Sequence, residues 1–125
     1  MKLLNLIVFF AFVTNALGKI GENSAECSAR YGQPVRVTAD RTFYEKNGIR
    51  VTVAFADDKR CAMILYSPIS NDGKPFTKSQ RTALLKMNKG RKDWPDPAVG
   101  TLVMPDRIAV TGDSTVMVRL KSFKP

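Results

Sequence analysis

The side chains able to do chemistry in this 125-residue sequence are carboxylates and cations, because histidine is absent. Without histidine there is no Ser-His-Asp or Cys-His nucleophile, no histidine general base and no histidine-bearing zinc site. Asp57 and Asp58 are adjacent, but they stand between two predicted strands, where a turn is expected. The other loop carboxylates stand singly: Asp72, Asp93, Asp96 and Asp106. A pair of distant loop carboxylates is the remaining catalytic alternative, and we expect no enzyme activity, no cofactor and no metal.

Cysteine supplies the second candidate chemistry. Cys27 and Cys61 are the only two in the chain, and an even count in an exported protein indicates one disulfide. That bond would close a loop of about 35 residues and stabilise the fold by about 4 kcal/mol. Two inert buried thiols are an alternative. A redox-active pair is another, although such pairs are usually close in sequence.

Cations form the third set, on a chain of net charge +9 and pI near 9.9. Such a charge favours contact with an anionic partner, or only keeps the protein in solution. One group of candidate anion-binding residues lies on a predicted helix and in the loop after it: Lys78, Arg81, Lys86, Lys89, Arg91, Lys92 and Trp94. Cations beside an exposed aromatic suit a phosphate, an anionic glycan or a membrane interface. Alternatively, the cations complement the end of the helix and Trp94 covers the core.

A second basic group is expected on one face of a sheet. If Val35, Val51, Val110 and Val118 point to the core, the alternation of side chains along a strand places four cationic side chains on the opposite face of the sheet. These candidate sheet-face residues are Arg36, Arg50, Arg119 and Lys121. The face that they define either binds an acidic partner or is simply solvated.

Two short helices are needed to position these side chains. Asn23 and Glu26 have the spacing of a capping box before a helix over Ser24 to Tyr31, which Gly32 and Pro34 end. Thr77 and Gln80 form a second box before a helix from Lys78 to about Asn88. Its buried stripe is predicted to be Ala83, Leu84 and Met87.

Alternating apolar residues predict strands after each helix. The expected strands are residues 35–38, 42–45, 49–55, 60–66, 99–104, 107–111 and 115–121, with hairpin turns at Asn47-Gly48 and Gly112-Asp113. The segment from Arg60 to Tyr66 is apolar on both faces and is therefore expected to be central. The predicted class is α+β: an antiparallel sheet of six to seven strands with both helices on one face, in two helix-plus-meander halves.

Residues 1–18 have the composition of a secretory signal peptide. Lys2 precedes an apolar run from Leu3 to Val13, and Ala16-Leu17-Gly18 resembles a cleavage site. We expect cleavage after Gly18, one secreted or periplasmic domain over 19–125, and no transmembrane segment in the mature chain, because the run is too short to span a bilayer. Lys19 follows the cleavage site where an acylated cysteine would be required for lipid anchoring, so we expect a soluble protein.

The segment Glu26-Cys27-Ser28-Ala29-Arg30-Tyr31-Gly32-Gln33-Pro34 resembles the start of small secreted bacterial proteins of uncharacterised function. In these, a short helix ends in a Tyr-Gly-x-Pro turn and a β-meander follows. More distantly, the segment is similar to the outer-membrane-assembly lipoprotein fold and to the β-lactamase-inhibitor-like fold. The resemblance implies a binding or scaffolding module. The chain departs from the assembly lipoproteins because it lacks their lipid-attachment cysteine.

The sequence therefore predicts an exported, non-catalytic module that contacts an anionic component of the cell envelope or the extracellular space. The alternative is a secreted protein inhibitor or envelope assembly factor that binds another protein through its sheet face. A hydrolase that uses loop carboxylates is a third hypothesis. Export makes a specific nucleic-acid partner unexpected.

Overall fold

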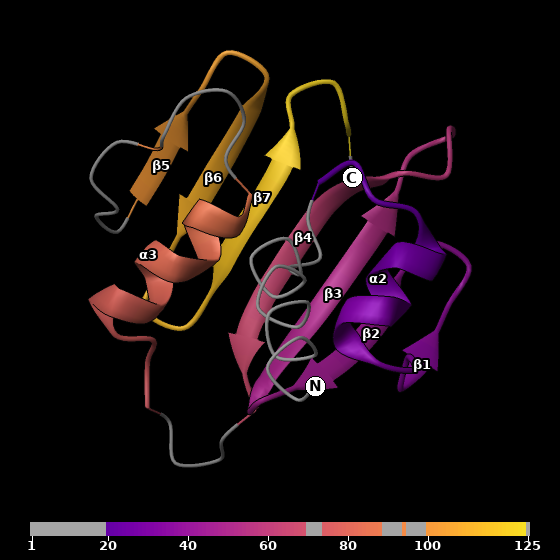
Figure 1. Ribbon diagram of the computed structural model, residues 1–125. Helices are drawn as coiled ribbons and strands as arrows, with labels where there is room; N and C mark the ends of the chain where they lie inside the picture. The colour runs from indigo at the N-terminus through magenta and orange to yellow at the C-terminus, as the bar shows by residue number, and fades with distance from the viewer. Residues whose placement is uncertain (1–19, 70–73, 89–93, 95–99, 125) are drawn as a thin grey trace, which may run out of the picture.

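The structure, a computed structural model, describes residues 20–69, 74–88, 94 and 100–124, and the predicted signal peptide lies outside them. The elements are α2 (Ser24–Tyr31), β1 (Arg36–Val37), β2 (Thr42–Lys46), β3 (Ile49–Phe55), β4 (Cys61–Pro68), α3 (Lys78–Met87), β5 (Gly100–Val103), β6 (Arg107–Thr111) and β7 (Val116–Leu120). All seven strands form one antiparallel sheet, which confirms the predicted α+β class (Figure 1).

The strand order is β1-β2-β3-β4-β7-β6-β5. Two meanders, β1–β4 and β5–β7, are therefore joined edge to edge by the pairing of β4 with β7. Each helix precedes one meander in the chain, and both helices lie on the same side of the sheet, α2 over the first meander and α3 over the second (Figure 1).

Both predicted capping boxes are present. Asn23 Oδ1 accepts from the Glu26 amide at 2.9 Å, while Glu26 Oε1 accepts from the Asn23 amide at 2.9 Å. Thr77 and Gln80 make the equivalent reciprocal bonds at the start of α3. These bonds satisfy amides that have no partner within the helix, so each helix begins where its sequence predicts.

The buried stripe of α3 differs from the prediction. Leu84 and Leu85 are buried, at 4% and 1% exposed, whereas Ala83 is exposed. Met87 packs against the core from its edge. The helix is therefore rotated so that its leucines meet the sheet, because these side chains bury more apolar area than alanine does.

The two predicted hairpins are both formed, with different loops. Asn47 and Gly48 take φ values of 53° and 79° and directly join the paired residues Lys46 and Ile49, as a tight Asn-Gly turn requires. The second hairpin is longer, because Thr111 pairs with Val116 and four residues connect them. It closes through the bond from the Gly112 amide to the Thr115 carbonyl at 2.8 Å.

The core lies between the helices and the side of the sheet that they cover. Its largest members from the sheet are Tyr44, Val51, Val53, Ile64, Tyr66, Val116 and Val118. Val51 and Val118 thus point inward as predicted. The inward placement of Val35 and Val110 is wrong, since these residues are 57% and 40% exposed. Val110 pairs with Met117, one position away from the inward pair Ala109 and Val118, so it points to the opposite face.

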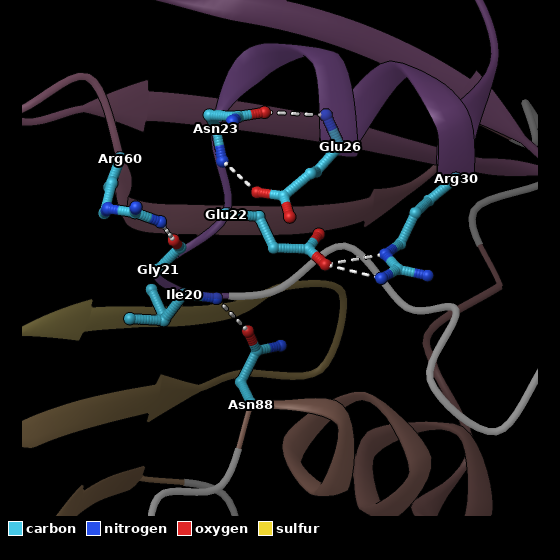
Figure 2. Close-up of polar contacts among 8 residues, drawn as sticks. All are labelled: Ile20, Gly21, Glu22, Asn23, Glu26, Arg30, Arg60 and Asn88. Atoms are coloured by element: carbon cyan, nitrogen blue, oxygen red, sulfur yellow. Dashed lines mark hydrogen bonds and ion pairs between the residues drawn. The ribbon is translucent and has the colours of Figure 1, made fainter. Parts of the chain in front are cut away.

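A short segment before α2 is joined to the start of β4 (Figure 2). The Gly21 amide donates to the Cys61 carbonyl at 2.8 Å, and the Cys61 amide donates to the Glu22 carbonyl at 2.6 Å. Arg60 donates to the Gly21 carbonyl at 2.9 Å. The Glu22 carboxylate, in a residue only 6% exposed, is paired with Arg30 of α2 at 2.7 Å, so this buried charge is compensated.

Asn88, just after α3, connects this segment to the rest of the core. Its Oδ1 accepts from the Ile20 amide at 3.1 Å (Figure 2), and its Nδ2 donates to the Tyr66 hydroxyl at 2.9 Å. Its backbone carbonyl accepts from Arg107 of β6 at 2.9 Å. Asn88 is 1% exposed, and its side chain bonds two elements that are distant in sequence.

We predict that Asn88→Ala lowers the free energy of unfolding by about 2–4 kcal/mol, because it removes the acceptor of the Ile20 amide and one hydrogen-bond donor to the Tyr66 hydroxyl in a buried site. Urea denaturation measures this. Gln33→Ala, at an exposed position, is the control and should change stability by less than about 0.5 kcal/mol. Equal stability of the two variants would contradict the role given to Asn88.

Candidate functional site

Three of the cations predicted around α3 lie in the described part of the chain: Lys78, Arg81 and Lys86. Lys78 and Lys86 are exposed, but Arg81 turns back and donates to the Phe76 carbonyl at 2.7 Å. A helix turns about 100° per residue, which places Lys86 about 140° around the axis from Arg81. Lys89, Arg91 and Lys92 lie outside the described residues.

Trp94 does not stand as an exposed aromatic beside these cations. It is half-buried and packs against the hydrophobic core, as in the alternative considered from the sequence. Its Nε1 is buried and finds no hydrogen-bond acceptor among the described residues. The ring therefore contributes apolar contact to the core, and its two faces are not both available for stacking on a ligand.

The side of the sheet away from the helices, here called the open face, carries a continuous row of side chains. The register of the strand pairs aligns Arg36, Phe43, Thr52, Leu65, Met117, Val110 and Thr101, one from each strand. Strands lie about 4.8 Å apart, so this row extends about 29 Å across the sheet. The centre of the row is apolar, and neither α2 nor α3 covers it (Figure 1).

A parallel row lies beside the first on the open face. It contains Ala54, Met63, Arg119, Ile108 and Val103. Val103 is 58% exposed and Val110, in the first row, is 40% exposed. Ala54 and Met63 are buried, at 0% and 8% exposed, so large apolar side chains of this face are exposed over β6 and β5 and covered over the end of β3 and the start of β4.

The cations predicted for this face are partly brought together. Arg36 lies over the ring of Phe43, with its guanidinium carbon 4.6 Å from the ring centroid. Arg50 pairs with Glu45 at 3.0 Å. Arg119 donates to the carbonyls of Leu120 and Phe123, so its guanidinium is already engaged by the C-terminal turn.

Lys121 follows the last residue of β7, Leu120, and is exposed. Its amide donates to the Asp106 carbonyl at 3.0 Å, next to the pair that Arg107 makes with Leu120. The placement of Lys121 on the same face as Arg119 stays a prediction.

Sequence reasoning missed the apolar members of the open face, Leu65, Met117 and Val110. One signal was available: the segment of β4 is apolar on both faces, which predicted a central strand but not an exposed second face. The neighbours of Leu65 in space come from β3 and β7. Only the pairing of β4 with β7, which local sequence does not encode, shows that apolar residues continue across the sheet.

The carboxylates considered for catalysis do not converge among the described residues. Asp57 and Asp58 are exposed in the turn after β3, where Asp58 accepts from the Arg60 amide at 3.0 Å. Asp106 pairs with Arg107 at 2.8 Å, and the hydrogen bond from that guanidinium holds the pKa of Asp106 below its usual value. Asp72, Asp93 and Asp96 lie outside the described residues.

An open hollow of about 680 Å³ lies between the start of α2 and the turns after β1 and β3. Asp40, Arg41, Asp57 and Lys59 line it, so it presents both signs of charge. Asn23 already caps the amides of α2 there. The described ranges contain no group of acidic, cysteine or histidine side chains arranged to hold a metal ion.

Cys27 and Cys61 are free thiols, both fully buried. They are not within disulfide distance, so the bond predicted from the sequence is not formed in this structure. The Cys61 sulfur is directed instead to the Met63 carbonyl, at 3.6 Å. Burial raises the pKa of Cys27 to about 12 and also raises the pKa of Cys61, because a thiolate is poorly solvated in the core.

No protein-family model and no curated protein matches this sequence. Among solved structures, the chain is similar to a cysteine-rich secretory protein from Staphylococcus aureus, with a TM-score of 0.50 and 11% sequence identity. The match covers 82% of this chain and 44% of that protein, so the chain spans less than half of the length of its neighbour. At this identity the likeness concerns the fold alone.

None of the described helices has the length and apolar character needed to span a bilayer.

We predict that the native protein reacts with Ellman's reagent at pH 8 about a thousandfold more slowly than free cysteine. With a pKa near 12, only about 10⁻⁴ of the Cys27 thiol is ionised at that pH. Raising the pH to 10 should increase the rate about a hundredfold, because the thiolate fraction rises tenfold per pH unit below the pKa.

The same reagent distinguishes free thiols from a disulfide. Protein denatured without reductant should give two thiols per chain, and Cys27→Ser or Cys61→Ser should each give one. No reactive thiol in the denatured, unreduced protein would contradict the free pair and restore the disulfide predicted from the sequence.

Proposed function

We propose that this protein is an exported, non-catalytic binding module that docks a partner protein on the open face of its sheet. The observation that carries the proposal is the apolar row in which Leu65 and Met117 are half-buried and Val110 is exposed, on the side of the sheet away from both helices. Exposed apolar patches of a few hundred Å² on small proteins are often functional, and larger ones mark interaction sites. A core of phenylalanine, methionine and leucine beside arginine has the composition of the centre of a protein interface.

The open face suits a protein better than a lipid surface or a polyanion. Surfaces that bind anionic lipid carry clusters of lysine and arginine, whereas the charged residues of this face are Arg36, Glu45, Arg50 and Arg119. Arg50 is paired with Glu45, and Arg119 with backbone carbonyls. The remaining positive charge is local, and the centre of the face is apolar, which favours a partner that buries apolar area.

Two further features support this proposal over a hydrolase. The described carboxylates do not converge on a common point, and the hollow beside α2 is open and lined by charges of both signs, whereas enzymes typically use an enclosed, mostly apolar cleft. Export is proposed from residues 1–18 alone, whose composition is that of a signal peptide. A secreted inhibitor and an envelope assembly factor would each bind another protein through the open face.

The docking proposal is tested by photocrosslinking in the cells that produce the protein. We predict that a photoreactive benzoylphenylalanine at Val110, on the open face, gives one discrete product with a single protein. The matched control is the same residue at Ala83, which is exposed on α3 on the other side of the sheet. Both positions are exposed, so neither substitution removes core packing.

The proposal requires the Val110 product to be absent, or at least about tenfold weaker, when the photoreactive residue is at Ala83. Equal products from both positions would overturn docking through the open face. Products that contain only phospholipid or glycan would replace the protein partner with an envelope component.

Export is tested by sequencing the amino terminus of the protein recovered outside the cytoplasm. We predict that it begins at Lys19, because the small residues Ala16 and Gly18 occupy the positions that signal peptidases read. Replacing Ala16 with Phe should abolish this cleavage and leave a precursor larger by about 18 residues. A protein that keeps Met1 and remains in the cytoplasm would contradict export.

A further inference from the structure

We propose that Arg36 is the specificity anchor of the open face and that it receives a carboxylate side chain, Asp or Glu, from the partner protein. This inference rests on the proposed function, since it assigns a role within the same docking surface. It adds the chemistry of the partner: an acidic group at the β1 end of the row, followed by apolar contact over β4, β7 and β6.

The first step of the argument is the position of the guanidinium. Arg36 lies 4.6 Å above the centroid of the Phe43 ring, in the first row of the open face and directly across the β1–β2 ladder. A planar guanidinium stacked on an aromatic ring keeps its edge N–H groups free for a planar, bidentate acceptor. The stacking also restrains a flexible side chain before binding, which reduces the entropy lost in the complex.

The second step is the absence of an internal counter-ion. Within the part of the chain that the structure describes, no carboxylate forms an ion pair with Arg36, whereas Arg30, Arg41, Arg50 and Arg107 each have one. Arg36 is also exposed. It is therefore the cation of the open face whose strong donors are not already used.

The third step concerns charge around the anchor. Glu45 is the acidic residue that shares this face, and Arg50 neutralises it at 3.0 Å. An incoming carboxylate thus meets a net positive surface on a chain of net charge +9, which accelerates encounter and orients the partner. A second copy of this chain is disfavoured as the occupant, because it would bring the same uncompensated positive charge to the interface.

The fourth step is the asymmetry of the row. Arg36 stands at one end, and Leu65, Met117 and Val110 occupy the other half, about 15–25 Å away at the spacing of strands. A charged anchor at one end and apolar contact at the other fixes the direction in which the partner lies. This arrangement resembles the polar rim and apolar centre of specific protein interfaces.

The experiment uses the full chain with the photoreactive residue at Val110 and measures the yield of the product with its protein partner. Arg36→Glu should lower this yield at least about fivefold, because like charges repel where an ion pair is expected. Arg36→Lys should recover only part of the yield, since lysine keeps the charge but not the planar, stacked fork. Lys86→Glu makes the same change in net charge on the helix side and should leave the yield unchanged.

Salt provides a second readout. Raising the ionic strength from about 0.05 M to 0.5 M should reduce the yield of the unsubstituted chain more than that of Arg36→Gln, which lacks the charge at position 36. Arg36→Gln also serves if Arg36→Glu unfolds the short β1 strand.

The outcomes separate this inference from the docking proposal. No Val110 product in the unsubstituted chain would overturn docking itself. A product whose yield is the same in Arg36→Glu, Arg36→Gln and Lys86→Glu would leave docking in place and overturn the role of Arg36. Loss of yield in Lys86→Glu alone would assign recognition to the α3 side.

Discussion

The pairing of β4 with β7 is the constraint on which the rest of the structure depends. In the strand order it is the one ladder that joins the two meanders, and it aligns Ile64 with Val118 and Leu65 with Met117. The first pair lies in the core, with both residues 0% exposed, and the second lies on the open face. One ladder thus makes the core continuous beneath both helices and makes the apolar row continuous on the opposite side.

Polar bonds between the helices and the sheet reinforce this join. Asn88 contacts Tyr66 of β4 through its side chain and Arg107 of β6 through its carbonyl, so it bridges the two meanders. Burial raises the pKa of Tyr66 to about 12, and its hydroxyl therefore stays protonated and available to this network. The helix side of the sheet is closed and internally bonded, which leaves the open face as the broad surface available to a partner.

Local signals in the sequence predicted the elements well, because the interactions that create them span few residues. The Asn23 and Thr77 boxes and the Asn47-Gly48 turn are contacts between neighbours in the chain. The candidate site was harder to predict, because the exposure of a side chain and its hydrogen-bond or ion-pair partners depend on residues that are distant in sequence. The side on which Val110 lies follows from its pairing with Met117. The spacing of Cys27 and Cys61 does not determine the separation of their sulfurs, and the end of β7 is not marked in the sequence.

The bond between Ile20 and Asn88 joins residues 68 positions apart, and this separation bears on the order of folding. Closing a long loop costs conformational entropy before the contact compensates for it, so contacts of high sequence separation form late. The segment before α2 emerges early during synthesis, yet its partners Cys61 and Asn88 follow much later. In a vectorially synthesised chain the bonds of Gly21 and Glu22 with Cys61 can form once β4 is complete, whereas the bond of Ile20 with Asn88 can form only after α3 is complete.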